Sequence, residues 1–490
     1  MKDLTNENGL PSNWATAKLG EICFTTSGGT PSRKVKKFFD GNIPWVKSGE
    51  LKHNIILDTE EKISDEALDN SSAKIFPKGT LLIALYGATV GKLAFLGIEA
   101  ASNQAVCGIY QNEIIELNLL YYFLFLQRQK LVEKSFGGAQ PNISQTMLKE
   151  LNIPLPPLPE QHRIVSKIEQ LFTDLNKGIE QLEKAQQQLK VYRQSVLKWA
   201  FEGKLTRQHH RLVGLTDATD SKDNSENKIS DSDKGELPKS WKLLMLKDLV
   251  KDKEGLRRGP FGSAIKKEYF VSDGYKVYEQ GNAINDDPYR GKYFVDEKKY
   301  QELINFKVLP HDLIVSCSGV TLGRISEIPE DGKAGIINQA LLRIRLRKEL
   351  ISNKFFIIHF RAAFFQKKIF EQSQGTAMPN LVGIKDFKEI EMMIPPSEEQ
   401  EKIVAEIESR LSVCDKIEET IENSLRQAEA LRQSILKKAF EGKLVAQNPK
   451  DEPAEKLLER IRAEEIKLNG KPEKEIKTKK REKATRLKLK

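Results

Sequence analysis

The sequences RQSVLKWAFEGKL, at residues 193–205, and RQSILKKAFEGKL, at residues 432–444, are nearly identical and lie 239 residues apart. Outward from these stretches, the match continues without a gap over residues 151–205 and 390–444. Weaker similarities precede it, such as GATVGK at 87–92 and GVTLGR at 319–324, with offsets that vary between 227 and 238 residues. The chain therefore consists of two homologous halves, each a variable globular region followed by a constant segment.

The constant segment of each half is predicted to be a long helix. Prolines at 156, 157 and 159 end the preceding strand-like run, and Glu160 places negative charge at the start of the helix, where the helix dipole favours it. Position a of a heptad repeat is apolar over five repeats in both copies, which is typical of a coiled-coil seam. The predicted seam residues are Ile168, Leu175, Leu182, Leu189, Val196, Ile407, Cys414, Ile421, Ala428 and Ile435.

Position d is less regular in the second copy than in the first. Arg410 and Lys438 stand there, where the first copy has Leu171 and Trp199. A long helix lying on a globular core is the alternative to a coiled coil. Two related helices most simply pack on each other about a pseudo-twofold axis. Parallel and antiparallel arrangements are both open, because the polar linker 206–236, which is expected to be disordered, could span either.

The globular regions are predicted to be mixed α/β. Strand-like runs such as TLLIALYG (80–87), AVCGIY (105–110), DLIVSCSG (312–319) and LLRIRL (341–346) alternate with turn signals. Helices are expected at residues 117–133 and 353–371. Residues 81–101 are largely apolar, but Lys92, Glu99 and three glycines interrupt them. This stretch therefore predicts two buried strands rather than a membrane span.

The composition permits nucleic-acid binding without requiring it. The net charge is +10, but residues 471–490 hold ten Lys or Arg and three Glu, so that this tail contributes +7 and the other 470 residues +3. Four widely spaced cysteines form no CxxC motif, which argues against disulfides or a zinc site. No apolar segment typical of a secretory signal begins the chain. We expect a cytoplasmic protein with no membrane partner and no metal site.

Some short stretches resemble catalytic motifs but lack residues that those motifs require. GATVGK has three residues between its glycines instead of the four of a phosphate-binding loop, and Leu93 follows where Ser or Thr would bind Mg²⁺. DDPY at 286–289 resembles part of an amino-methyltransferase motif but lacks its second proline. His209 and His210 lie in the polar linker without acidic or cysteine neighbours. We therefore expect a chain that is not an enzyme by itself.

Basic side chains mixed with aromatic and hydroxyl groups occur in one stretch of each globular region, at 25–52 and 256–270. Basic groups neutralise phosphates, and Arg, Asn, Gln and Ser can read base edges. A solvated basic loop is the alternative. The candidate DNA contacts are Arg33, Lys36, Lys37, Lys47, Arg257, Arg258, Lys266 and Lys267, of which Lys47, Arg257 and Arg258 are preferred.

In the order of its motifs the chain resembles the specificity subunit of type I restriction–modification systems. The resemblance covers nearly the whole chain. It rests on SGGTPSR (27–33), IPWVKSGEL (43–51), RRGPFGSAIK (257–266), YEQGNAIN (278–285), IPLPPLPEQHRIV (153–165), MIPPSEEQEKIV (393–404), both FEGKL endings and DEPAEKLLERI (451–461).

The resemblance implies two target-recognition domains, each of which reads one half of a bipartite, asymmetric site on double-stranded DNA. Two conserved helices pack antiparallel, set the spacing of the half-sites and dock two modification subunits. These subunits use S-adenosylmethionine to methylate adenine, and two restriction subunits add ATP- and Mg²⁺-dependent translocation and cleavage. No cofactor is expected in this chain. A coiled-coil scaffold whose heads bind proteins is the alternative.

The resulting domain prediction has six segments. The first recognition domain covers 1–155, the first helix 156–205 and the linker 206–236. The second recognition domain covers 237–394, the second helix 395–444 and a basic extension 445–490.

Overall fold

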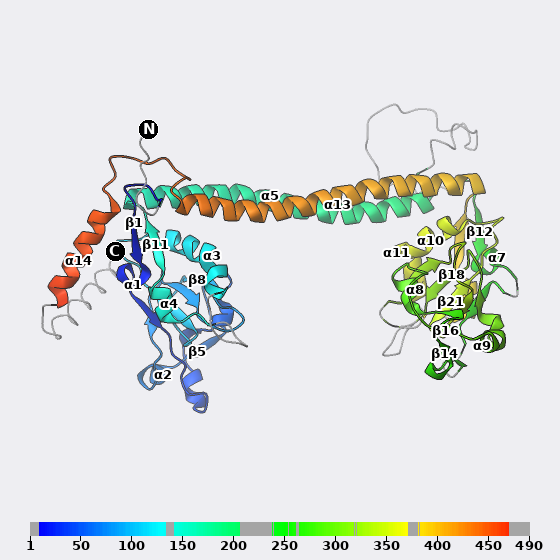
Figure 1. Ribbon diagram of the computed structural model, residues 1–490, viewed down its shortest axis with the longest axis horizontal. Helices are drawn as coiled ribbons and strands as arrows, with labels where there is room; N and C mark the ends of the chain where they lie inside the picture. The colour runs from blue at the N-terminus through cyan, green and yellow to red at the C-terminus, as the bar shows by residue number, and fades with distance from the viewer. Residues whose placement is uncertain are drawn as a thin grey trace. The chain divides into compact units, whose positions relative to one another are not determined.

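The computed structural model describes residues 9–133, 142–205, 238, 240–252, 254–260, 264–317, 319, 321–370, 381 and 383–469. The chain divides into two compact units, Met1–Gln181 with Asn423–Lys490 (unit 1) and Leu182–Glu422 (unit 2). Each unit holds one globular head and part of each of two long helices, α5 (Leu158–Phe201) and α13 (Ser397–Phe440) (Figure 1). The predicted linker and the basic tail 471–490 lie outside the described residues.

The first head, in unit 1, contains three sheets with the strand orders β1-β11, β2-β10-β7-β8-β4 and β5-β3-β9-β6. Short helices α1 (Leu19–Ile22), α2 (Asp65–Asp69) and α4 (Gln145–Lys149) and the longer α3 (Leu117–Glu133) accompany them. The strands are β1 (Ala15–Lys18), β2 (Thr25–Ser27), β3 (Ile43–Val46), β4 (Asn54–Ile56), β5 (Glu61–Ile63), β6 (Ile75–Phe76), β7 (Leu81–Ala84), β8 (Leu93–Leu96), β9 (Ala100–Ser102), β10 (Val106–Ile109) and β11 (Asn152–Leu155).

The second head, in unit 2, also has a two-stranded, a four-stranded and a five-stranded sheet among its described residues, with the strand orders β12-β22, β13-β21-β18-β19 and β14-β16-β15-β20-β17. Its helices are α7 (Leu246–Leu249), α8 (Gln280–Ile284), α9 (Glu297–Glu302), α10 (Asn353–Arg361), α11 (Ala363–Phe370) and α12 (Ile384–Lys388). Its strands are β12 (Lys242–Met245), β13 (Leu256–Arg258), β14 (Phe270–Val271), β15 (Tyr275–Tyr278), β16 (Phe294–Val295), β17 (Lys307–Val308), β18 (Leu313–Ser316), β19 (Ile325–Glu327), β20 (Gly335–Ile337), β21 (Leu341–Ile344) and β22 (Glu391–Ile394).

The two long helices run antiparallel in both units. In unit 1, Ile168 and Phe172 near the start of α5 share a core with Ile435 and Phe440 near the end of α13. In unit 2, Val196 and Phe201 at the end of α5 share a core with Ile403 and Ile407 near the start of α13. The sequence left both arrangements open. The structure therefore agrees with the antiparallel packing that the resemblance implied.

The repeated FEGKL stretches end the two long helices. Gly203 and Gly442 have φ angles of +71° and +69°, a left-handed conformation that glycine adopts without steric cost. The amide of Lys204 donates to the carbonyl of Trp199, and the amide of Lys443 donates to that of Lys438, so helix carbonyls that would lack partners are satisfied. A Cβ on Gly442 would lie 2.3 Å from Pro11, and one on Gly203 2.8 Å from Pro238. Each glycine thus allows its helix end to pack on the proline that begins a head.

The C-terminal extension of the chain folds onto the first head. The amide of Ala454 donates to the carbonyl of Asn13, and Arg163 forms an ion pair with Asp451 at 2.6 Å. The helix α14 (Ala454–Asn469) buries Ala454 and Leu458 in the core of unit 1 and lies beside β1 and α1 (Figure 1). We call residues 445–463 the strap.

Two of the expectations about local structure are confirmed and one is wrong. The apolar stretch 81–101 contains the buried, antiparallel strands β7 and β8, and the helix predicted at 117–133 is α3. The helix predicted at 353–371 is instead broken into α10 and α11, because the backbone of Ala362 is extended with ψ of 137°. Ala362 is buried in the core, which holds the break in place. None of the described helices has the length and apolar character needed to cross a membrane.

Candidate nucleic-acid interface

Half of the candidate cations of the first head are held in an ionic network. The guanidinium of Arg33 lies 2.7 Å from a carboxylate oxygen of Glu61 and 4.3 Å from the ring centroid of Phe39. The Lys47 ammonium lies 2.7 Å from Glu60 and 3.1 Å from Glu61. Hydrogen bonds with these two carboxylates raise the pKa of Lys47. These contacts tie Arg33 and Lys47 to the head's own acidic groups.

Lys36 and Lys37 lie differently, in a short 3₁₀ helix at Lys36–Phe39. Both side chains are exposed, and neither forms an ion pair with another described residue. Phe38 and Phe39 anchor this turn in a small apolar core with Trp45. The turn therefore exposes the ammonium groups of Lys36 and Lys37, while the rings of Phe38 and Phe39 hold it against the head.

In the second head, the candidate cations lie on and after β13, which is an edge strand of its sheet. Arg257 and Arg258 are partly exposed, and neither has an acidic partner in the part of the chain that the structure describes. Lys266 lies 3.6 Å from Glu268, and Lys267 is exposed at the start of a 3₁₀ turn. The Nε of Arg257 is buried, and no described residue forms a hydrogen bond with it.

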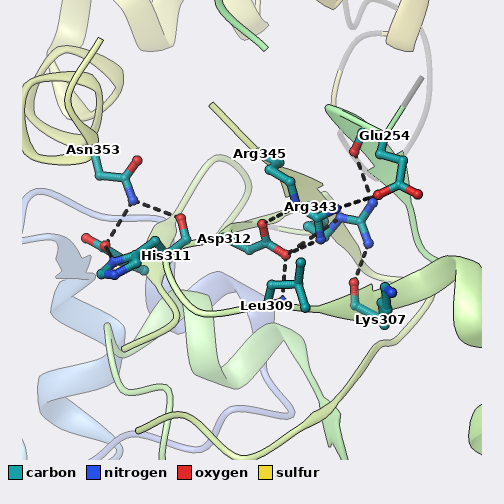
Figure 2. Close-up of polar contacts among 9 residues, drawn as sticks. Glu254, Lys307, Leu309, His311, Asp312, Arg343, Arg345 and Asn353 are labelled. Carbon is teal, nitrogen blue, oxygen red and sulfur yellow. Dashed lines mark hydrogen bonds and ion pairs between the residues drawn. The ribbon is translucent and has the colours of Figure 1, made fainter. Parts of the chain in front are cut away.

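An ionic network of the buried residues Arg343, Arg345 and Asp312 and the exposed Glu254 lies next to β13, on and around the neighbouring strand β21. Figure 2 shows the side chains of Arg343, on β21, and Arg345, just after this strand, directed toward Asp312 and Glu254. Arg345 donates to both carboxylate oxygens of Asp312, at 2.7 Å and 2.8 Å, and lies 2.6 Å from Glu254. Asp312 is buried and also accepts a hydrogen bond from the amide of Leu309. The network thus ties the strand β21 to the segment that leads into β13.

Arg343 joins the two larger sheets of the second head. It is fully buried and donates to the carbonyl of Lys307 on β17 and to that of Glu254 at 3.0 Å. In the part of the chain that the structure describes, its Nε has no hydrogen-bond partner, and it lies 4.0 Å from the nearest oxygen of Asp312. Burial, and then the charge of Arg345, lower the pKa of Arg343 to about 10. An arginine at this pKa is still a cation at neutral pH.

No local sequence pattern predicted this network. The run LLRIRL indicated an apolar strand, and its alternating arginines were the available signal. Arginines spaced by two residues point to the same face of a strand. Their acidic partners lie some 30 and 90 residues away in the chain, at Asp312 and Glu254, which a local pattern cannot reveal.

The predicted seam residues lie along the facing sides of the two long helices. Leu175 and Leu182 are partly exposed. The other eight are buried: Ile168, Leu189, Val196, Ile407, Cys414, Ile421, Ala428 and Ile435. In unit 2 a groove of about 500 Å³ opens beside this seam, lined by Ala185, Gln188, Leu189, Tyr192, Ser409, Arg410, Val413, Cys414 and Ile417.

The first residue of the repeated stretch makes contact with the opposite helix in each unit. In unit 2, Arg193 lies 2.7 Å from Asp415 and 2.9 Å from Glu418. In unit 1, the equivalent Arg432 donates to Asn176 at 2.7 Å, and its guanidinium lies 4.9 Å from the ring centroid of Phe172. Asp415 and Asn176 are themselves related by the 239-residue offset, so both units use the same helix register with different chemistry.

Comparisons with known proteins agree with this architecture. The family model "Type I restriction modification DNA specificity domain" matches residues 11–184 and 238–427. The StySPI specificity subunit of Salmonella potsdam is 27% identical and matches 95% of this chain and 98% of its own length. The EcoKI specificity subunit of Escherichia coli K12 is 25% identical and matches 94% of this chain and 97% of its own length.

Two solved structures share the fold. The first, from work on the assembly and conformational transition of the type I R-M system, has a TM-score of 0.63 and 19% identity, and the match covers 89% of this chain and 99% of that one. The HsdS subunit from Thermoanaerobacter tengcongensis has a TM-score of 0.54 and 18% identity, with 90% and 100% covered. Because the family model matches both halves, the chain belongs to the family of type I restriction–modification DNA specificity proteins.

Proposed function

We propose that this chain is the DNA sequence-specificity subunit of a type I restriction–modification complex, in which each head reads one half of a bipartite, asymmetric site. The two conserved helices set the spacing between the half-sites. Support comes from the family match on both halves and from relatives that are named type I specificity subunits and align over nearly their whole length.

One observation carries this proposal: the two heads have related sheets but carry their exposed basic residues on different elements, while the two long helices have the same length and register and end in the same FEGKL stretch. The first head offers Lys36 and Lys37 on an aromatic turn, and the second offers Arg257 and Arg258 on an edge strand. Heads that read different half-sites are expected to diverge, whereas helices that bind two copies of one partner are expected to keep a common length and register.

We infer that the long helices dock two modification subunits and that two restriction subunits complete the complex. The groove in unit 2 supports docking, because Val413 and Ile417 expose apolar surface beside the seam. Their counterparts by the 239-residue offset are Asp174 and Gly178. The two docking surfaces therefore differ in apolar area, and we expect the surface in unit 2 to bind its partner more tightly.

In this proposal the chain has no catalytic role of its own. S-adenosylmethionine would bind the modification subunits, and ATP and Mg²⁺ would serve the restriction subunits. The chain directs adenine methylation and restriction by placing those subunits on the correct DNA sequence.

Selection of double-stranded DNA from a random library tests the proposal. The purified complex of this chain with its modification subunits is expected to enrich one sequence with two specified parts separated by an unspecified spacer. Enrichment of no sequence would contradict the proposal and would favour the alternative, a scaffold whose heads bind proteins.

A further inference from the structure

Two arginines of the second head face each other across neighbouring strands. Arg257 on β13 pairs directly with Arg343 on β21 in the antiparallel register. Like charges directly opposite each other destabilise a sheet. The charge of Arg257 contributes to the lowering of the pKa of Arg343, which places the two cations within electrostatic reach. The folded head therefore has two positive charges close together at the edge of its sheet.

The acidic groups of the network offset only part of this charge, because Asp312 and Glu254 are shared among Arg343 and Arg345, and no described acidic residue forms an ion pair with Arg257. Both oxygens of Asp312 accept hydrogen bonds from Arg345, which also binds Glu254. Arg343 instead donates to two backbone carbonyls, and the nearest acidic oxygen is 4.0 Å from its Nε. The Nε atoms of both Arg257 and Arg343 are buried without hydrogen-bond partners among the described residues. Arg343 is therefore a buried cation with an unused donor beside the partly exposed Arg257.

The first head shows that the fold does not require this charge. There Thr26 occupies the position of Arg257 in the register, and Gly108 that of Arg343. A Cβ on Gly108 would lie 2.4 Å from the ring of Phe76, so an apolar ring fills the space that the second head gives to a guanidinium. The arginine pair is thus a property of the second head alone.

We propose that Arg257 and Arg343 form an anion site that accepts a backbone phosphate of the DNA. This inference rests on the proposed function. Arg257 makes the contact from the accessible edge strand β13. Arg343 is a positioning residue. Its fixed charge repels Arg257, and an anion bound beside Arg257 would reduce this repulsion. A backbone phosphate carries a negative charge, whereas a DNA base is neutral.

The test is the salt dependence of DNA binding by the complex of the full chain with its modification subunits. The probe is the duplex that wild-type complex selects, between 50 and 300 mM salt. Loss of one phosphate contact lowers the slope of log K against log salt by about 0.9. We expect this change for Arg257→Gln, with binding about tenfold weaker at low salt. Arg257→Lys should keep the wild-type slope.

Two further variants separate positioning from a general structural effect. Arg343→Met should lower the slope when Arg257 is present and leave it unchanged in the Arg257→Gln background. Thr26→Gln, the matched substitution in the first head, should leave the slope unchanged. If Arg343→Met does not fold, Arg257→Gln alone still decides the phosphate contact.

Two results would overturn the inference. One is a wild-type slope in Arg257→Gln, and the other is a changed base preference, which would make Arg257 a reader of bases. Both leave the proposed function intact, because the wild-type complex would still select its sequence. A wild-type complex without any selected sequence would instead contradict the proposed function.

Discussion

His359 shows how one residue can give one half of a repeated chain its own response to pH. Its ring lies in unit 2, 4.4 Å from the ring centroid of Phe201, and burial lowers its pKa to about 3. In unit 1, Phe123 packs in the same way on Phe440, at 5.1 Å. Phe440 and Phe201 are related by the 239-residue offset, so a buried histidine in one unit replaces a phenylalanine in the other.

We predict that this histidine makes unit 2 sensitive to acid. The folded state keeps the imidazole neutral, whereas the unfolded chain binds a proton below about pH 6.5. Stability is therefore lost as the pH falls from about 6.5 toward 3, and the free energy of unfolding drops by about 2 kcal/mol at pH 5. His359→Phe should remove this loss. Urea unfolding at pH 7.5 and 5.0, followed in each unit by hydrogen exchange, measures it.

Phe123→His provides the matched control in unit 1. This substitution places a buried histidine in unit 1. It should lower the free energy of unfolding of unit 1 at pH 5 by a similar amount. An acid sensitivity of unit 2 that is the same in wild type and in His359→Phe would contradict the account.

At the scale of elements, the strap of residues 445–463 packs against the core of the first head. Gln447 donates to Glu160 at 2.8 Å, a buried carboxylate that also accepts from the indole of Trp14 at 3.0 Å. Leu458 is buried in the same core. Deletion of residues 447–490 should therefore lower the free energy of unfolding of unit 1 by roughly 2–4 kcal/mol and leave unit 2 unchanged.

Deletion of residues 470–490 alone is the control for this prediction. It removes the strongly basic tail but none of the contacts described for the strap. Urea unfolding of both truncated chains, followed by hydrogen exchange in each unit, makes the comparison. Equal destabilisation by both deletions, or loss of unit 2 with unit 1, would contradict a role of the strap in the first head.

Long periodic elements could be predicted from the sequence, and breaks within them could not. Residues 117–133 carried enough apolar residues and no breaker, and α3 has these bounds. The break at Ala362 was missed because alanine favours a helix and its extended backbone depends on burial in the core. The network of Arg345 and Asp312 was missed for a related reason, since partners distant in the chain meet only in the folded sheet.

At the scale of the whole molecule, the chain is two versions of one design. Both units have related sheets, the same helix register and the same glycine ends, and the family match covers both halves. The two units differ in the exposed basic residues of the heads, in the apolar face beside Tyr192 and Val413, and at buried positions such as Arg343 and His359. This organisation suits the proposed function, in which the chain binds two copies of one partner subunit and two different DNA half-sites.

The exchange of one head tests this account most directly. The second head, residues 242–394, would be replaced by the corresponding head of a family member with another known site. DNA selection by the resulting complex is then compared with selection by the wild-type complex. We predict that one specified half of the bipartite site changes while the other half and the spacer length stay the same. Change of both halves, or of neither, would contradict the claim that each head reads one half.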